Sequence, residues 1–241
     1  MYEGEEIHDL PAPGYRLIQD CSHFRYGTDA VLLADFCRPD KDARAADLGA
    51  GTGAVSLLLL AREKAARVDA VELQPRLCDM MRRSVQLNGL SGRMSVYEAD
   101  LRRLAGTLEA GAYGCVVCNP PYRAAGAGRV SPDPARRVAL FETECTLPEV
   151  LAAGLRLLRS RGRMYLCHRP GRLCDLAAAA REYGGELKRI QFVHPYADRR
   201  PSLLLAELCK DGRPGLVCEP PLILYAAKGV QTAQLRRIYG W

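Results

Sequence analysis

From residue 43 onward, short β-rich runs alternate with longer segments of helical periodicity, and this alternation restricts the chain to few folds. Such alternation is typical of parallel strands joined by right-handed helical crossovers. We expect strands at residues 44–48, 67–73, 93–99, 113–118, 163–168, 187–193 and 202–208. Helices are expected between them, at about residues 53–64, 75–88, 146–159 and 172–183.

The last two expected strands are joined only by the segment "HPYADRRP", which is too short for a helical crossover. They should therefore form an antiparallel hairpin, with one reversed strand at the edge of the sheet. The sequence predicts an α/β fold: a doubly wound, mostly parallel seven-stranded sheet with an antiparallel edge hairpin. Because no internal repeat or linker is visible, we expect one domain at residues 41–241 and an N-terminal extension at residues 1–40 that covers it.

The composition, with 48% hydrophobic and 26% charged residues, is close to the average of folded soluble proteins. No apolar stretch approaches the ~20 residues that cross a bilayer, and the acidic start lacks the regions of a signal peptide. We therefore expect a cytoplasmic protein with no membrane partner. The ten cysteines lie in apolar runs and include one Cys-x-x-Cys pair, Cys115 and Cys118, but no second such pair, and the four histidines include no His-x-x-x-His. No metal site is expected.

The net charge of +6 comes from 34 basic residues, of which only five are lysine. Arginine suits contact with phosphate, but a solvated basic surface has the same composition. The charge alone therefore favours a nucleic-acid partner only modestly.

A glycine-rich segment, "DLGAGTGA", begins at Asp47 and joins the first predicted strand to the first helix. Gly49 and Gly51 allow a sharp turn that approaches a ligand closely, and Gly53 should keep the helix near the strand. The segment also satisfies the dinucleotide pattern, with Glu72 about 20 residues further on to hold a ribose. Asp47 is unfavourable beside a pyrophosphate, but it suits a ligand with an ammonium and a sulfonium.

The glycine spacing and the order of elements resemble those of class I S-adenosylmethionine-dependent methyltransferases over residues 43–208, a Rossmann-like fold. The resemblance implies S-adenosylmethionine as cofactor, with Asp47 near its methionine portion, Glu72 on the ribose hydroxyls and Asp100 beside the adenine amino group. All three acids follow strands, where open α/β sheets bind ligands. The implied cofactor-binding residues are Tyr26, Gly27, Thr28, Asp47, Gly49, Gly51, Gly53, Glu72, Leu73, Asp100, Leu101 and Asn119.

The segment "NPPY", at the end of the fourth predicted strand, suits a site that grips a planar amine. The Asn119 side-chain oxygen and the Pro120 carbonyl can accept the amine hydrogens, so that the nitrogen lone pair turns toward a sulfonium methyl. Pro121 follows, and Tyr122 can stack on the base. Alone, Asn-Pro-Pro also forms ordinary turns. The segment resembles the signature of methyltransferases that act on adenine N6 or on the glutamine amide of release factors, and its four residues are the predicted catalytic set.

The N-terminal "RYGTDAVLLADF" resembles the segment before the first strand in bacterial tRNA adenine-N6 methyltransferases, which act on adenine 37 of a valine tRNA. The likeness continues in "TECTLPEVL", "GRPGL", "PPLILY" and "RRIYG". It implies methylation of adenine N6 in tRNA, and a helix from Gly27 and Thr28 that brings Tyr26 and Asp29 near the donor. Two departures from the family are Phe141, in place of a frequent His, and residues 226–235, in place of an acidic run.

Two arginine-rich segments could contact RNA phosphates. They supply Arg123, Arg129, Arg136, Arg137, Arg199 and Arg200. Solvated loops of the same composition are the structural alternative for both. Two other functions also stay open: N5-glutamine methylation of a translation factor, and a non-catalytic RNA-binding protein of the same fold. Glutamine methyltransferases carry a helical domain before the catalytic domain, whereas only about 40 residues precede the first predicted strand here.

Overall fold

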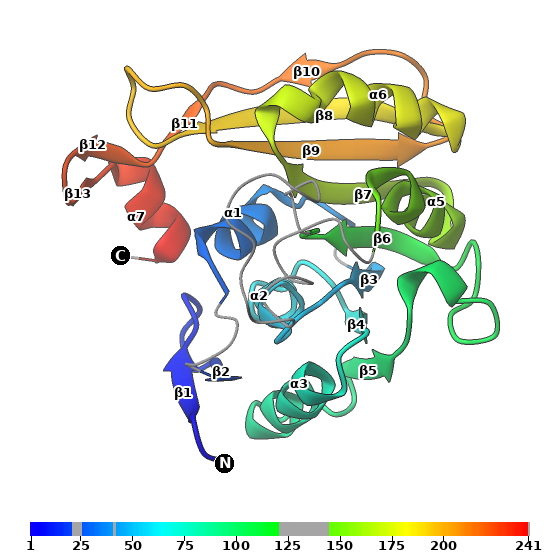
Figure 1. Ribbon diagram of the computed structural model, residues 1–241, viewed down its shortest axis with the longest axis vertical. Coiled ribbons are helices and arrows are strands. Elements are labelled where there is room, and N and C mark those ends of the chain that lie inside the picture. The colour runs from blue at the N-terminus through cyan, green and yellow to red at the C-terminus, as the bar shows by residue number, and fades with distance from the viewer. Residues whose placement is uncertain (21–25, 41, 121–144, 241) are drawn as a thin grey trace.

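The computed structural model describes residues 1–20, 26–40, 42–120 and 145–240, and its centre is a mixed β-sheet (Figure 1). The long strands are β3 (Arg44–Leu48), β4 (Arg67–Glu72), β5 (Met94–Glu98), β6 (Tyr113–Cys118), β7 (Leu158–His168), β8 (Gly185–His194) and β9 (Leu203–Lys210). Two short strands, β10 (Val217–Cys218) and β11 (Leu222–Ile223), both pair with β8. The order across the sheet is β10-β8-β9-β7-β6-β3-β4-β5.

All seven predicted strands are confirmed, and the four predicted helices lie between them. These helices are α2 (Ala54–Ala61), α3 (Pro75–Leu87), α5 (Leu147–Leu157) and α6 (Leu173–Glu182). Strands β3 to β7 pair in parallel, as expected from the helical crossovers.

The reversed strand is β9, and its predicted position at the edge of the sheet is wrong. It lies between β7 and β8 and pairs antiparallel with both. The chain crosses from β7 through α6 to β8 and leaves room for one strand between β7 and β8. After the short connection that follows β8, strand β9 fills this space. Seven of the eight residues of β9 are buried, as an interior strand requires.

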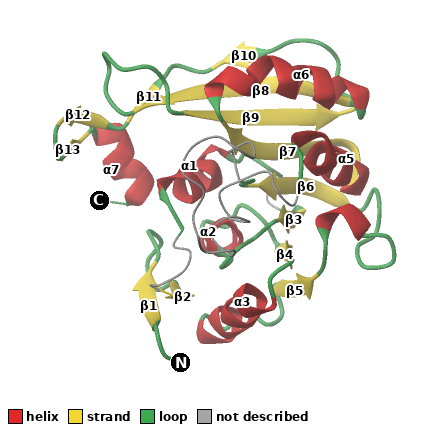
Figure 2. Cartoon of the chain, in the orientation of Figure 1, coloured by secondary structure: helices red, strands yellow, loops and turns green. Residues whose placement is uncertain are grey.

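Two hydrophobic clusters cover the two faces of the sheet, so the fold is doubly wound (Figure 2). On one face, α1 (Thr28–Phe36), α2 and part of α3 pack against strand residues whose side chains point to that face, among them Val117 and Cys167. On the other face, α5, α6 and the 3-10 turn η1 (Leu101–Arg103) pack against Val116 and Cys118. Adjacent residues of β6 therefore belong to opposite layers, as strand geometry dictates.

The N-terminal hairpin of β1 (Glu5–Asp9) and β2 (Arg16–Asp20) was not predicted. The sequence "EEIHD" of β1 contains one apolar residue, so it carries no alternating pattern. Ion pairs with α3 hold the hairpin instead: Arg83 contacts Glu5 at 2.6 Å, and Arg76 pairs with the fully buried Asp20. Such contacts between distant segments leave no local signal.

The C-terminal segment adds the hairpin of β12 (Tyr225–Ala227) and β13 (Val230–Gln231) and the short helix α7 (Ala233–Tyr239). Helix α7 packs on α1, where the Tyr239 hydroxyl lies 3.3 Å from the Thr28 hydroxyl. Two local signals mark this helix: Thr232 accepts a bond from the Leu235 amide, and Gly240 closes the helix with φ +76°. Within the described ranges, no helix is both long and apolar enough to span a bilayer.

Lys64 ties the end of α1 to the segment that follows α2. Its Nζ donates to the carbonyl oxygens of Ala34, Asp35 and Cys37 at 2.8, 2.5 and 2.8 Å. These carbonyls belong to the last turn of α1, which has no intrahelical donors for them. Burial lowers the pKa of Lys64, because the ammonium group has lost part of its hydration. The three carbonyl oxygens replace the lost water contacts.

We predict that Lys64→Met lowers the free energy of unfolding by about 2–4 kcal/mol, because three partly buried carbonyls are left without their donor. Chemical denaturation monitored by circular dichroism measures the change. Lys188→Met is the matched control, since Lys188 donates one exposed bond to the Arg213 carbonyl at 3.0 Å. The control should change stability by less than about 1 kcal/mol. Equal destabilisation of the two variants would contradict the assigned role of Lys64.

Candidate functional site

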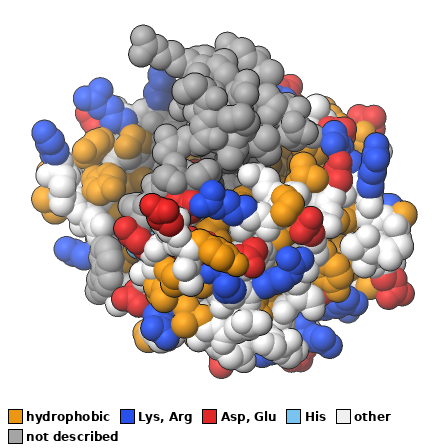
Figure 3. Space-filling view, turned by 60° about the horizontal axis from the view of Figure 1, so that its bottom comes forward, with side chains coloured by type: hydrophobic (Ala, Val, Ile, Leu, Met, Phe, Trp, Pro, Cys, Tyr) orange, Lys and Arg blue, Asp and Glu red, His pale blue; other side chains and the backbone are white. Residues whose placement is uncertain are grey.

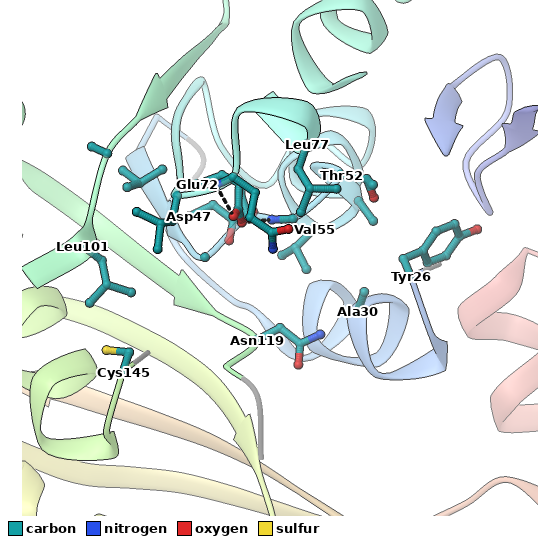
Figure 4. Close-up of a pocket in the computed structure, with 18 of the residues that line it drawn as sticks. Tyr26, Ala30, Asp47, Thr52, Val55, Glu72, Leu77, Leu101, Asn119 and Cys145 are labelled. Atoms are coloured by element: carbon teal, nitrogen blue, oxygen red, sulfur yellow. Dashed lines mark hydrogen bonds between the residues drawn. The ribbon is translucent and has the colours of Figure 1, made fainter. Parts of the chain in front are cut away.

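A pocket opens at the carboxyl ends of β3, β4, β5 and β6 (Figure 4). It encloses about 1000 Å³ of empty space, including the open solvent at its mouth. Its lining is formed by Tyr26, Ala30, Asp47, Gly49, Ala50, Gly51, Thr52, Ala54, Val55, Val71, Glu72, Leu73, Gln74, Leu77, Ala99, Asp100, Leu101, Asn119 and Cys145.

The glycine turn after β3 curls over the end of β4. The amides of Gly49 and Ala50 both donate to the Val71 carbonyl at 2.9 Å. Gly49 and Gly51 have φ of +69° and +58°, a left-handed conformation that side chains resist. The turn therefore brings bare backbone to the pocket wall, as the sequence predicted.

Gly53 allows a close approach between α2 and α3 that the sequence does not predict. Its φ is +88°, and a Cβ atom there would lie 2.8 Å from the Met81 Cγ atom of α3. The residue thus lets the start of α2 approach α3, and its role in keeping α2 near its own strand stays a prediction. Gly53 supports the pocket without lining it.

Asp47 forms the floor of the pocket and is almost fully buried. Its Oδ2 accepts a 2.7 Å hydrogen bond from the Ser56 hydroxyl at the start of α2. Burial raises the pKa of the Asp47 carboxyl to about 7, and the charge of Glu72 adds to this effect. A cationic ligand would favour the ionised form of this carboxyl, because it would replace part of the lost hydration.

Glu72, at the end of β4, fastens the glycine turn from the other side. One carboxylate oxygen accepts from the Gly51 amide and the other from the Gln74 amide, both at 2.9 Å. Burial raises the pKa of Glu72. Since a carboxylate oxygen accepts more than one hydrogen bond, the same group can also receive ligand hydroxyls.

Asp100 follows β5, and its carboxyl group is held in the ionised form by a neighbouring arginine. Arg102 contacts its carboxylate at 2.6 Å and lowers the pKa of Asp100. The same carboxylate accepts the Arg102 backbone amide at 2.9 Å and so starts η1. A ligand amino group at Asp100 would share this carboxylate with Arg102.

The wall opposite Leu101 and Cys145 comes from the start of α1 (Figure 4). Tyr26 is fixed by a 2.9 Å hydrogen bond from its amide to the Gln19 side chain, and Ala30 lies one turn further on. The neighbouring Gly27 and Thr28 do not line the pocket. They begin the helix that supplies this wall.

Asn119 follows β6, and its side chain lies on the α1 side of the pocket (Figure 4). Its Oδ1 accepts a 2.7 Å hydrogen bond from the Cys167 thiol of β7. Cys118 pairs with Leu166 in the sheet, so Cys167 stands directly beside Asn119. The thiol therefore orients the amide toward the pocket. Pro120 is buried and follows directly.

Several predicted residues lie outside the described ranges, and their roles stay predictions. These are Pro121, Tyr122, Arg123, Arg129, Arg136, Arg137 and Phe141. Arg199 and Arg200 are exposed in the connection between β8 and β9.

Ten pocket residues were missed by the sequence reasoning: Ala30, Ala50, Thr52, Ala54, Val55, Val71, Gln74, Leu77, Ala99 and Cys145. Most of them flank a motif residue, so the motifs themselves point to them. Cys145 lies within the segment "TECTLPEVL", which resembles the family but gave no sign that this residue lines the pocket.

The lining residues fit a nucleoside with a cationic amino-acid tail. Acidic groups stand at the floor and at the far end of the pocket, and either one would repel a pyrophosphate. Among the described residues, the buried Thr52 hydroxyl has no hydrogen-bond partner, although burying it so is costly. The geometry favours S-adenosylmethionine over a dinucleotide.

Comparison with protein families and curated proteins agrees with this geometry. The family model of the methyltransferase small domain matches residues 22–133. A tRNA1(Val) (adenine(37)-N6)-methyltransferase of Parabacteroides distasonis is 29% identical over 184 residues, which are 76% of each chain. One of Tolumonas auensis is 28% identical over 204 residues, 84% of each chain.

Solved structures share the fold. A predicted O-methyltransferase from Agrobacterium tumefaciens superposes with a TM-score of 0.70 and 25% identity, covering 88% of this chain and 95% of that one. M. jannaschii TYW2 in complex with AdoMet gives a TM-score of 0.59 with 16% identity, covering 87% and 88%. The chain therefore has the fold of the class I S-adenosylmethionine-dependent methyltransferases, and its residues 22–133 match the methyltransferase small domain.

Proposed function

We propose that this protein transfers a methyl group from S-adenosylmethionine to the exocyclic N6 amine of an adenine in tRNA. The observation that carries the proposal is the position of Asn119, which opens the "NPPY" segment and lines the donor pocket. The relatives described above are named for this reaction on adenine 37 of tRNA1(Val). We therefore take adenine 37 of a valine tRNA as the first target to test, and the cytoplasm as the location.

The pocket residues would hold the donor in three zones. Asp47 and the glycine turn suit the cationic methionine end, Glu72 suits the ribose, and Asp100 with its neighbour Leu101 suits the adenine ring. Leu73, which is 43% exposed in this structure, would cover the ring edge. When bound, the cofactor supplies a methyl group that is already activated by a positively charged sulfur.

The amine is handled by acceptors. The Asn119 oxygen, oriented by Cys167, and the Pro120 carbonyl would accept the two amine hydrogens and leave the nitrogen lone pair directed at the methyl group. Proline suits this position because it offers a carbonyl and no competing amide hydrogen. Since the donor is activated, alignment supplies most of the acceleration and no strong general base is needed.

The surface charge does not by itself mark where RNA binds. On the face shown in Figure 3, Lys and Arg side chains are interspersed with Asp and Glu. The two kinds of charge are mixed on this face, so we look for RNA contacts around the pocket.

A direct test is incubation with methyl-labelled donor in the presence of separate pools of tRNA and of cellular protein. Label in tRNA, mapped to N6-methyladenosine by mass spectrometry of nucleosides, supports the proposal. Label in protein alone would indicate N5-glutamine methylation of a translation factor. Tight tRNA binding without any transfer would indicate a non-catalytic RNA-binding protein.

Asn119→Ala should lower kcat by about 100-fold or more, because it removes one of two acceptors that align the amine. The dissociation constant of the donor should change by less than about threefold, since Asn119 acts on the substrate. Asn119→Asp keeps an acceptor oxygen and should retain more activity than the alanine variant. Isothermal titration and steady-state kinetics measure both effects. A parallel loss of donor binding and turnover would assign Asn119 to the donor site instead.

Donor affinity should depend on pH through Asp47. Its folded-state pKa of about 7 means that the carboxyl is neutral below that pH and attracts a cation only above it. We expect the dissociation constant of S-adenosylmethionine to rise by about tenfold from pH 8 to pH 6. Asp47→Asn should bind weakly at pH 8 and show little change between the two pH values. If its pH dependence equals that of the wild type, Glu72 or the ligand itself is the titrating group.

A further inference from the structure

Two tyrosines from distant parts of the chain meet at the end of β8. Tyr196 lies in the connection between β8 and β9, and Tyr225 begins β12. Their ring centroids are 5.9 Å apart and the ring planes are inclined by 41°. Both side chains are partly exposed. The β8–β9 connection and the segment from β11 to β12 lie together at the same end of the sheet (Figure 1).

Backbone hydrogen bonds hold this pair in place without any ligand. The Leu224 amide donates to the His194 carbonyl at 2.9 Å, and the Tyr225 amide donates to the Pro195 carbonyl at 3.0 Å. The turn itself is closed by the Arg199 amide, which donates to the Tyr196 carbonyl at 3.1 Å. The rings are therefore preorganised, which reduces the entropic cost of binding a partner.

The tyrosine pair lies at the end of the sheet where β6 and β8 have their carboxyl ends, which is also the end that holds the candidate site. Strands β6, β7 and β8 run in the same direction, so the residues after β8 lie at the same edge as Asn119. In the sheet order, β8 is three neighbours from β6, which separates the two strands sideways by roughly 14–15 Å at the usual strand spacing. The register places Asn119 level with Gln191, so Tyr196 also lies five residues further along the strand direction. A few nucleotides of single-stranded RNA can bridge that separation.

The surroundings of the pair are mainly cationic. Arg199 and Arg200 are exposed in the same turn, and Lys228 is exposed in the turn between β12 and β13. The acidic residue of the first turn, Asp198, lies 3.8 Å from Arg199, and both side chains are largely exposed, so their pairing is weak. Single-stranded nucleic acid binds to such surfaces, because its bases stack on partly exposed aromatic rings and its phosphates contact the neighbouring cations.

We propose that Tyr196 and Tyr225 form a stacking platform for an unpaired base of the substrate RNA, a few nucleotides from the methylated adenine. Arg199 and Arg200 hold the adjoining phosphates. This inference rests on the proposed function and deepens it, because it requires the target adenine to lie in a single-stranded loop. The platform recognises the loop rather than the base that receives the methyl group.

The test compares Tyr196→Ala, Tyr225→Ala and the double variant with wild type on a tRNA transcript and on its anticodon stem-loop. Each single variant should raise KM for RNA by about fivefold or more, while kcat and the donor dissociation constant stay within about twofold. Tyr→Phe variants should behave like wild type, because the ring face provides the contact. Tyr→Leu variants keep apolar bulk but lack that face, so they should resemble the alanine variants.

Tyr183→Ala is the matched control. Tyr183 is 37% exposed and precedes β8, so it lies at the amino end of that strand, away from the tyrosine pair. Its removal should leave KM for RNA unchanged. Thermal unfolding of every variant identifies any that fails to fold, and the Phe and Leu pairs then carry the comparison.

Salt dependence separates stacking from phosphate binding. The double variant Arg199→Ala/Arg200→Ala should lower the slope of log affinity against log salt by about 0.7 for each phosphate that is no longer neutralised. The tyrosine variants should weaken affinity and keep the wild-type slope. Arg213→Ala, an exposed arginine at the opposite edge, should change neither quantity.

Equilibrium binding of the stem-loop, measured without donor, distinguishes failure of this inference from failure of the proposed function. If wild type methylates tRNA but the Tyr196/Tyr225 double alanine variant keeps wild-type KM and binding, the platform is refuted. If the Phe variants are impaired as much as the Ala variants, ring stacking is also refuted. If no RNA is methylated, the proposed function fails, and stem-loop binding that depends on the two rings would still support the platform.

Discussion

The parallel pairing of β3 with both β4 and β6 is the constraint on which the rest of the structure depends. Parallel neighbours end at the same edge, so three connections that follow different strands converge there. Asp47, Glu72 and Asn119 are far apart in sequence, yet this pairing places them around one pocket. Turning the chain back after β4 or β6 would disperse them.

The pocket carries polar groups whose burial is costly in the free protein. The raised pKa of Asp47 and of Glu72 and the unpartnered hydroxyl of Thr52 all reflect lost hydration. A cationic, hydroxyl-rich ligand would interact with the two carboxylates, so part of the free energy that their burial costs would be recovered on binding. Ser56, Gly51 and Gln74 hold the two carboxylates in position meanwhile, which limits the reorganisation that binding requires.

Both ends of the chain contribute to the region around the site. Helix α1 supplies one wall, and Lys64 fastens its last turn. Arg62 joins three segments, since it donates to the carbonyls of Pro11 and Ile238 and lies 3.5 Å from Asp35. Tyr239 of α7 also meets Thr28 at the start of α1, so the C-terminal segment adjoins the pocket wall that α1 supplies.

The sequence by itself determined the elements whose signals are local. Periodicity located the seven strands and four helices, and the glycine turn and "NPPY" marked two stretches of the pocket wall, because turn chemistry depends on neighbouring residues. Only the tertiary structure decided what distant segments do to one another. Five features join segments that are far apart in the sequence: the position of β9, the docking of the β1–β2 hairpin on α3, the approach of Gly53 to Met81, the bond from Cys167 to Asn119 and the meeting of Tyr196 with Tyr225. Such contacts are selected by packing and by the burial of charge, which a pattern along one chain does not encode.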